Sequence, residues 1–172
     1  MTAIPTLETE RLILKGPTLD DYPDIAAMWG DPDVVEYIGG VPFKPEETWA
    51  RLLRYAGHWA LLGFGSWVVR DKAGTFVGDV GLFDFHRDLE PKLDIPELGW
   101  VLAKRAHGKG YATEAVQRIL AWGEQHFGPR PFSCIIDEGN QASHRVAQKC
   151  GFRQRAVAQY KGTPVVVYRR DG

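Results

Sequence analysis

The residues best suited to chemistry lie where an apolar segment at 98–102 gives way to an amphipathic one. Gly108 and Gly110 stand at this junction, with the basic residues Arg105 and Lys109 beside them. Glycines at such a hinge let a ligand approach the backbone without meeting a Cβ. The unpaired N–H groups of the following helical turn, with the positive end of its dipole, favour an anion. A phosphate-bearing ligand is predicted, and the alternative is a plain strand-to-helix turn with a solubilising basic flank.

Two widespread phosphate-binding motifs do not describe this junction. A P-loop needs four residues between its glycines and a Lys-Ser/Thr pair, and the chain has neither here. The dinucleotide fingerprint needs a third glycine, where this chain has Thr113. What remains is a strand followed by Arg105, two residues, Gly108, one residue and Gly110.

Strands and helices must position this junction, and hydrophobic periodicity predicts both. Thr18 caps the first helix, with Asp21 at its N3 position, and Gly151 ends the last helix. The predicted strands are Arg11–Lys15, Ser66–Arg70, Phe76–Phe85, Glu97–Leu102, Phe132–Ile136, Phe152–Tyr160 and Val165–Arg169. The predicted helices are Thr18–Trp29, a long one from Pro45, the one after Gly110, and Asn140–Cys150, with a short helical turn at Asp31–Tyr37.

Two of these helices have predicted apolar faces. The face of the long helix is expected to comprise Trp49, Leu52, Leu53, Ala56 and Ala60. The face of the helix after the glycines is expected to comprise Ala112, Ala115, Val116, Ile119 and Leu120. The element order β-α-α-β-β-β-α-β-α-β-β implies an α/β fold of the α+β type, a mixed sheet with helices on both faces.

Composition narrows the function classes. The chain of 172 residues fits one domain, and its 44% hydrophobic and 25% charged content is typical of soluble proteins. A net charge of −1 argues against a nucleic-acid or membrane surface. No apolar run reaches the roughly 20 residues of a membrane span, and residues 1–10 do not resemble a signal peptide.

The two cysteines, Cys134 and Cys150, lack metal-ligand spacing. They are expected to be small buried hydrophobes in a reduced, cytoplasmic protein. The alternative is a nucleophilic thiol.

The pattern Arg105-x-x-Gly108-x-Gly110 resembles the pyrophosphate-binding signature of the GNAT superfamily of acyl-CoA-dependent N-acyltransferases. Further motifs resemble its RimJ/RimL-type branch, in the same order along essentially the whole chain. These motifs are Glu8–Leu14, Asp31–Val34, Glu97–Leu102, Gly108–Ala115, Asn140–Val146 and Lys149–Phe152. The resemblance implies a single GNAT domain over residues 1–172, with a mixed, largely antiparallel sheet of about seven strands.

One departure concerns the residues before the glycines. The branch often has a proline and an aromatic residue there, whereas this chain has Lys104, Arg105, Ala106 and His107. The replacement makes the turn more basic, which suits a phosphate. Whether Lys104 or Arg105 contacts the 3′-phosphate of the adenosine is left open.

The resemblance implies acetyl-CoA as cosubstrate and no metal. The backbone of the strand before the turn would pair with the pantetheine arm, and the amides of the turn would hold the pyrophosphate. Asn140 and Ser143 would contact the arm near the thiol, although Asn140 also suits a plain N-cap. The implied cofactor residues are Trp100, Val101, Leu102, Arg105, His107, Gly108, Lys109, Gly110, Tyr111, Ala112, Thr113, Asn140 and Ser143.

Acetyl transfer to an amine needs a proton acceptor, oxyanion stabilisation and a proton for the departing thiolate. The resemblance makes Glu97 the candidate base and Ser143 the candidate acid, with Tyr160 as the second candidate acid. A backbone N–H of Val101 or Leu102 would stabilise the oxyanion. His86 and His144 are weaker candidates for proton relays.

The acceptor is expected between the two N-terminal helices and the loop at 84–96. Its aromatic residues (Trp29, Tyr37, Trp49 and Trp59) either pack in the core or line the pocket. Its acidic residues (Asp84, Asp88, Glu90 and Asp94) either attract a cationic amine or form a solvated loop.

The resemblance suggests a protein or peptide N-terminus, or a small amine, as acceptor. It leaves a monomer or a homodimer open. The alternative function is a catalytically silent acyl-CoA-binding or sensing domain.

Overall fold

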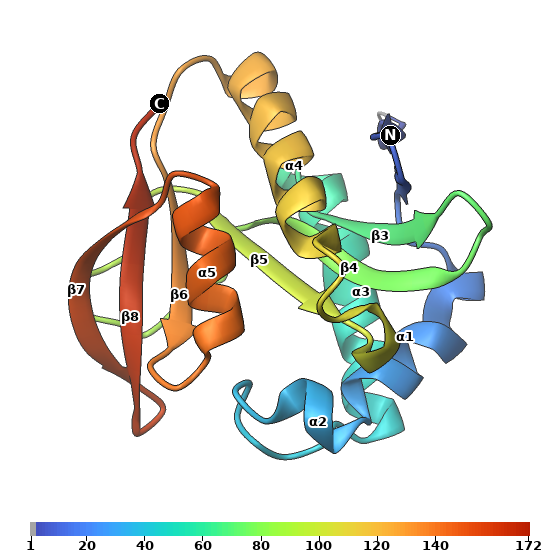
Figure 1. Ribbon diagram of the computed structural model, residues 1–172, viewed down its shortest axis with the longest axis horizontal. Helices are drawn as coiled ribbons and strands as arrows, with labels where there is room; N and C mark the ends of the chain where they lie inside the picture. Colours follow the sequence, from blue (N-terminus) through green and yellow to red (C-terminus); the bar gives the residue numbers. More distant parts are fainter. Residues whose placement is uncertain (1–2) are drawn as a thin grey trace.

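The strands form one mixed sheet in the order β1-β2-β3-β4-β5-β6-β8-β7 (Figure 1). The structure is a computed structural model that describes residues 3–172. The strands are β1 (Leu7–Glu8), β2 (Leu12–Lys15), β3 (Ser66–Asp71), β4 (Phe76–Phe83), β5 (Glu97–Leu102), β6 (Phe132–Asp137), β7 (Arg153–Tyr160) and β8 (Thr163–Arg170). The helices are α1 (Tyr22–Trp29), α2 (Pro32–Val35), α3 (Pro45–Leu62), α4 (Tyr111–Phe127) and α5 (Gln141–Lys149).

All seven predicted strands are confirmed, and the sheet has one further strand. The additional strand is β1, in which Leu7 pairs with Leu14 and Glu8 with Ile13. A strand of two residues has no alternation to detect, and it is ordered by pairing with β2.

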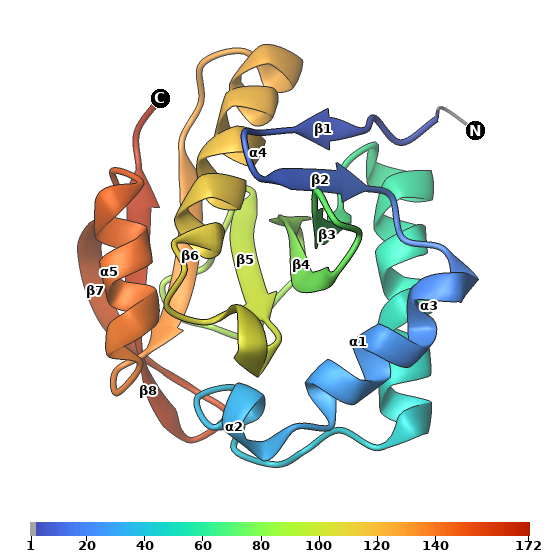
Figure 2. The same cartoon turned by 45° about the vertical axis from the view of Figure 1, so that its right-hand side comes forward.

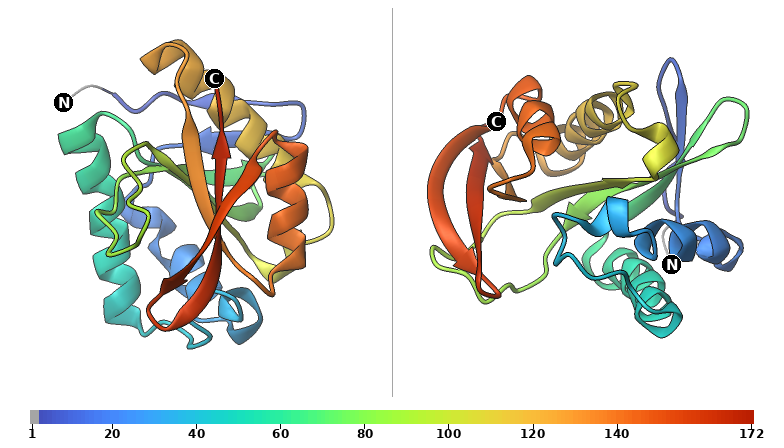
Figure 3. Two further views of the ribbon diagram at one scale, coloured as in Figure 1. Left: turned by 90° about the vertical axis from the view of Figure 1, so that its left-hand side faces the viewer. Right: turned by 60° about the horizontal axis from the view of Figure 1, so that its bottom comes forward.

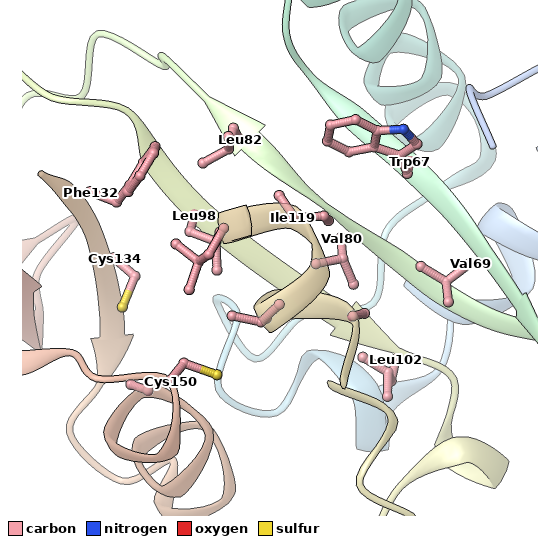
Figure 4. Packing of buried hydrophobic residues seen from close by; sticks show 14 of the residues in the cluster. Trp67, Val69, Val80, Leu82, Leu98, Leu102, Ile119, Phe132, Cys134 and Cys150 are labelled. Carbon is pink, nitrogen blue, oxygen red and sulfur yellow. The ribbon is translucent and has the colours of Figure 1, made fainter. Parts of the chain in front are cut away.

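The helices cover both faces of the sheet, as predicted (Figure 3). Helices α4 and α5 lie on one face, and α1, α2 and α3 lie on the other. The predicted apolar stripe of α4 is confirmed: Ala115, Val116, Ile119 and Leu120 are buried. Side chains from β3, β4 and β5 meet Ile119 there in the main hydrophobic core (Figure 4). Within the described residues, no helix combines the length and the apolar character that crossing a bilayer requires.

The predicted apolar face of α3 is wrong. Trp49 and Leu53 are 43% and 50% exposed, and the buried residues are Thr48, Leu52, Tyr55 and His58. Polar groups mark the true inner face because each finds a partner: Tyr55 donates to Asp79, and His58 contacts backbone carbonyls. A count of apolar residues therefore assigns the helix the wrong side.

Strands β5 and β6 form the only parallel pair among the described strands, and they separate almost at once. Their register contains one residue pair, Glu97 with Ser133, and the Ser133 N–H donates to the Pro96 carbonyl at 2.9 Å. Both strands then diverge toward their carboxyl ends (Figure 2). The edge of residues 99–102 that faces away from β4 consequently has no strand partner.

The two adjacent leucines of α3 test the corrected face. Leu52 is 3% exposed and Leu53 is 50% exposed. Leu52→Ala is expected to lower the free energy of unfolding by about 2–5 kcal/mol because it leaves a cavity. Leu53→Ala, the matched control, is expected to change it by less than about 0.5 kcal/mol. Urea denaturation measures both, and an equal loss in the two variants would contradict the assigned face.

Candidate active site

The glycine turn is built as the sequence predicts. Gly108 and Gly110 have φ values of 74° and 77°, in the left-handed region that favours glycine. Gly110 is the N-cap of α4, and no side chain caps the first turn of that helix. A Cβ added at Gly108 would meet no protein atom within 4 Å, so the space in front of it is open. The turn thus presents uncapped amides to an open surface, as an anion site requires.

Arg11 of the N-terminal segment holds this turn in place. Its Nη1 donates to the Lys109 carbonyl at 2.8 Å, and its Nε donates to Glu114 at 2.7 Å. The guanidinium also lies over the Tyr111 ring, 4.6 Å from its centroid. The start of the sheet and the first turn of α4 are therefore tied together at the predicted phosphate site.

The basic residues before the glycines are engaged within the protein. Arg105 donates to the Phe76 carbonyl at 3.0 Å, and His107 Nε2 lies 2.8 Å from the Leu102 carbonyl oxygen. Lys104 forms an ion pair with Asp33. These contacts link the segment before the glycines to β4, β5 and the start of α2, although Lys104, Arg105 and His107 are exposed, as Lys109 is.

The open edge of β5 faces the start of α5. Asn140 is the N-cap of α5, and its Oδ1 accepts a hydrogen bond from the Ser143 amide at 3.1 Å. Trp100 Nε1 donates to Ser143 Oγ at 3.2 Å, across the gap between the two elements. Because an indole can only donate, the Ser143 hydroxyl keeps its own hydrogen for another acceptor.

A cavity of about 650 Å³ adjoins this edge and is lined by the three predicted catalytic residues and by part of the predicted cofactor site. Its floor is formed by β4 and β5, and one wall is formed by α3 with the segment after α2. Asn140 and Ser143 line it, and so does Tyr160 from β7. Trp29 and Tyr37 line it as well, and Trp29 also packs in a hydrophobic core cluster.

Glu97 lines the cavity, but its carboxylate is already paired. Arg87 donates from Nε to Glu97 Oε2 at 2.7 Å and from Nη2 to Oε1 at 2.8 Å. The Arg87 guanidinium also lies over the rings of Phe85 and Tyr160, at 4.7 and 4.9 Å. Bidentate pairing fixes the carboxylate in the cavity. Arg87 was not singled out from the sequence, because it stands in the loop that connects β4 to β5.

Asp79 is a second carboxylate of the cavity that sequence reasoning missed. It is 3% exposed, and it accepts hydrogen bonds from Trp29 Nε1 and the Tyr55 hydroxyl, both at 3.1 Å. Burial raises the pKa of Asp79 to about 6, against opposing effects of Arg51 and the two hydrogen bonds. The available signal was a single acidic residue within the segment Phe76–Phe83, whose other residues are all apolar or glycine.

Several predicted groups do not reach the cavity. His144 is buried between the Tyr168 hydroxyl and the Glu138 carbonyl, and His86 lines a separate hollow. Burial raises the pKa of the Cys134 thiol well above its usual value, and that of Cys150 to about 11. Neither thiol is therefore available as the thiolate that a nucleophile requires.

The acidic loop residues and two of the aromatic residues are also absent from the cavity. Asp84, Asp88 and Asp94 line the separate hollow of about 600 Å³, and Glu90 lines neither space, which is consistent with the solvated-loop alternative. Trp49 packs edge-on against Tyr22 at the surface. Trp59 packs in the core, against two further tryptophans.

The known proteins that this chain matches include several acetyltransferases. The model of the acetyltransferase (GNAT) domain matches residues 11–153. YkkB of Bacillus subtilis (strain 168) is 32% identical over 182 residues, which cover 99% of this chain and 98% of YkkB. An acetyltransferase from Agrobacterium tumefaciens superposes with a TM-score of 0.85 at 26% identity, over 100% of this chain and 97% of its own. RimL, solved in complex with coenzyme A, shares the fold at a TM-score of 0.79 and 16% identity. The match covers 97% of this chain and 98% of RimL.

The fold and the domain match define an acetyltransferase. The chain belongs to the GNAT family of N-acetyltransferases, as its motifs predicted.

Two glycines with the same conformation provide a matched test of the turn. Gly108 and Gly74 have φ values of 74° and 88°, and a Cβ at either would meet nothing within 4 Å. Alanine at each position carries a similar backbone penalty. Gly108→Ala is expected to weaken acetyl-CoA binding about tenfold or more. Gly74→Ala, in the β3–β4 hairpin, is expected to leave it unchanged. Calorimetric titration measures the acetyl-CoA affinity of both variants. Equal affinities would show that the phosphate does not bind at this turn.

The pKa of Asp79 predicts a pH dependence of stability. The carboxyl keeps its proton in the folded state up to about pH 6, whereas an Asp of ordinary pKa releases it near 3.8. Protonated Asp79 therefore contributes fully to the stability of the folded state below pH 3.8. This contribution to the free energy of unfolding is lost as pH rises through 6. The free energy of unfolding of the wild type should fall relative to Asp79→Asn across this window. Urea denaturation in a pH series measures it, and parallel curves would contradict the assignment.

Proposed function

We propose that the protein is an acetyl-CoA-dependent N-acetyltransferase that moves the acetyl group directly to a primary amine. The observation that carries the proposal is the unpaired edge of β5, which leads into the uncapped glycine turn. An extended arm with amide groups fits the first feature, and a pyrophosphate fits the second. The complex of RimL with coenzyme A supports this choice of ligand.

The proposed cosubstrate contacts follow the geometry of the two features. Trp100, Val101 and Leu102 provide the backbone groups that would pair with the arm as a strand does. The amides from Gly108 to Thr113 would hold the pyrophosphate, and the exposed Lys109 side chain is free to approach it. Arg105 and His107 act indirectly in this proposal, because their hydrogen bonds hold the turn against β4 and β5.

The proposed chemistry uses residues of the cavity. When bound, acetyl-CoA supplies an activated thioester. Glu97 receives the amine proton through a water molecule, since Arg87 occupies both of its oxygens. Ser143 donates its hydroxyl proton toward the departing sulfur, because Trp100 holds its oxygen and leaves its hydrogen free. Tyr160 is the second candidate donor.

The acceptor in this proposal is a protein or peptide N-terminus or a small amine, as for a RimJ/RimL-like enzyme. A silent acyl-CoA-binding domain remains the alternative function. A screen of acetyl-CoA consumption over peptide N-termini, amino acids, polyamines and aminoglycosides separates the two. Acetylation of any amine supports the enzyme, and acetyl-CoA binding without acetylation of the panel supports the silent domain.

Substitution of Ser143 and Glu97 tests their proposed roles. Ser143→Ala is expected to lower kcat about 100-fold, the usual contribution of a positioned proton donor, without weakening acetyl-CoA binding. Glu97→Gln is expected to lower kcat by a similar factor, because the amide cannot accept the proton of the amine. Trp100→Phe, which keeps the Ser143 hydroxyl but removes its anchor, should give an intermediate kcat. Full turnover of Ser143→Ala and Glu97→Gln across the pH series would exclude direct chemistry by both.

A further inference from the structure

Two arginines on the α3 wall of the cavity form no ion pair within residues 3–172. Arg51 and Arg54 both line the cavity, about one helical turn apart. Every ion pair of the described chain involves other residues. By contrast, the third cavity arginine, Arg87, is neutralised by Glu97. The α3 wall therefore carries positive charge without a matching carboxylate in contact.

Aromatic rings hold both guanidinium groups in place. The Arg51 guanidinium lies 3.8 Å from the centroid of the Trp29 ring and 4.9 Å from that of Phe43. The Arg54 guanidinium lies 4.8 Å from the centroid of Phe85. Rings over the planar face leave the N–H edge free to point elsewhere, and that edge matches a carboxylate or a phosphate. The buried Nε of Arg51 has no hydrogen-bond partner.

The charge at this wall is partly desolvated. Burial lowers the pKa of Arg54, and repulsion from Arg51 and Arg87 lowers it further. Arg51 is attracted by Asp79, which lies behind it in the floor of the cavity. A bound anion would relieve the repulsion among the three guanidinium groups, and hydrogen bonds to charged groups are stronger than neutral ones.

Acidic groups also line the cavity, on the sheet and on α3. Asp79 and Glu97 belong to the strands that border the open edge of β5. Glu47 also lines the cavity from α3, where its Oε2 accepts a hydrogen bond from the Lys44 amide in the first turn. Glu97 lies on β5, whereas Arg51 and Arg54 lie on α3, so a ligand with an amine toward β5 and an anion toward α3 would meet a carboxylate and two guanidinium groups.

We propose that the acceptor is a small amine that also bears a carboxylate or phosphate group, which Arg51 and Arg54 bind while the amine faces β5. This proposal rests on the proposed acetyl transfer and specifies its substrate class. The two arginines act in specificity and do not take part in the proton transfers. A cavity of about 650 Å³ suits a small ligand better than a folded partner.

Matched pairs of amines test the proposal in the wild-type protein. Glycine is compared with glycinamide, 4-aminobutyrate with its amide, and phosphoethanolamine with ethanolamine. The anionic member of at least one pair is expected to have a kcat/KM about tenfold or more above that of its neutral partner. The first two pairs measure the preference for a carboxylate, and the third measures the preference for a phosphate. Equal kcat/KM values within all three pairs would overturn the proposal.

Two variants locate the effect. Arg54→Gln and Arg51→Gln are each expected to reduce the preference for the anionic member at least about fivefold, with unchanged acetyl-CoA affinity. Arg54 as a whole residue is exposed, although neighbouring groups partly desolvate its guanidinium, so its substitution is compatible with folding. The matched control is Arg153→Gln, an exposed arginine on β7 outside the cavity, which should keep the preference. A preference that survives both cavity substitutions would overturn the assignment to α3.

Binding separates this proposal from the proposed function. If no amine of the panel is acetylated, the transfer reaction is the part that fails. Calorimetry of the coenzyme A-loaded protein with the same pairs then decides the anion site. Tighter binding of the anionic member to the wild type than to Arg54→Gln would sustain the site, and equal binding would overturn it.

Discussion

The separation of β5 from β6 is the constraint on which the rest of the site depends. A strand in the middle of a sheet normally has both edges paired, because unpaired backbone amides and carbonyls are costly when buried. Here the pairing is limited to Glu97 with Ser133, and residues 99–102 keep one edge open. The gap gives access to an acceptor cavity from one side of the sheet and to the glycine turn from the other.

The charged residues around the gap are each held in place by a different kind of interaction. On the turn, Arg11 and Arg105 are engaged with backbone carbonyls, so the backbone amides of α4 remain the groups that face outward. In the cavity, Arg87 fixes Glu97, and the donors of Trp29 and Tyr55 hold Asp79. The arginines of α3 are held by aromatic stacking instead. In the proposed function, the turn is the anion site for the donor and the mixed-charge cavity receives the acceptor.

Local sequence signals predicted most of the fold and the donor half of the site. The seven longer strands, the stripe of α4, the cap at Asn140 and the two glycines depend on residues close together in the chain, and all were predicted. The acceptor half depends on residues far apart. The bond from Trp29 to Asp79, the pairing of Arg87 with Glu97 and the inner face of α3 arise from tertiary contacts that periodicity cannot show. Apolar counting misplaced α3 because buried Tyr55 and His58 satisfy their polar atoms across the interface.

The central claim is that the open edge of β5 and the amides of the glycine turn are one continuous binding surface for the donor. Amide hydrogen exchange, measured with and without coenzyme A, tests it most directly. The account predicts slower exchange in the bound state at the amides of residues 99–102 that face away from β4 and at those of Gly108–Thr113. The β3–β4 hairpin should keep its rates. Saturating coenzyme A that left the exchange of both segments unchanged would contradict the account.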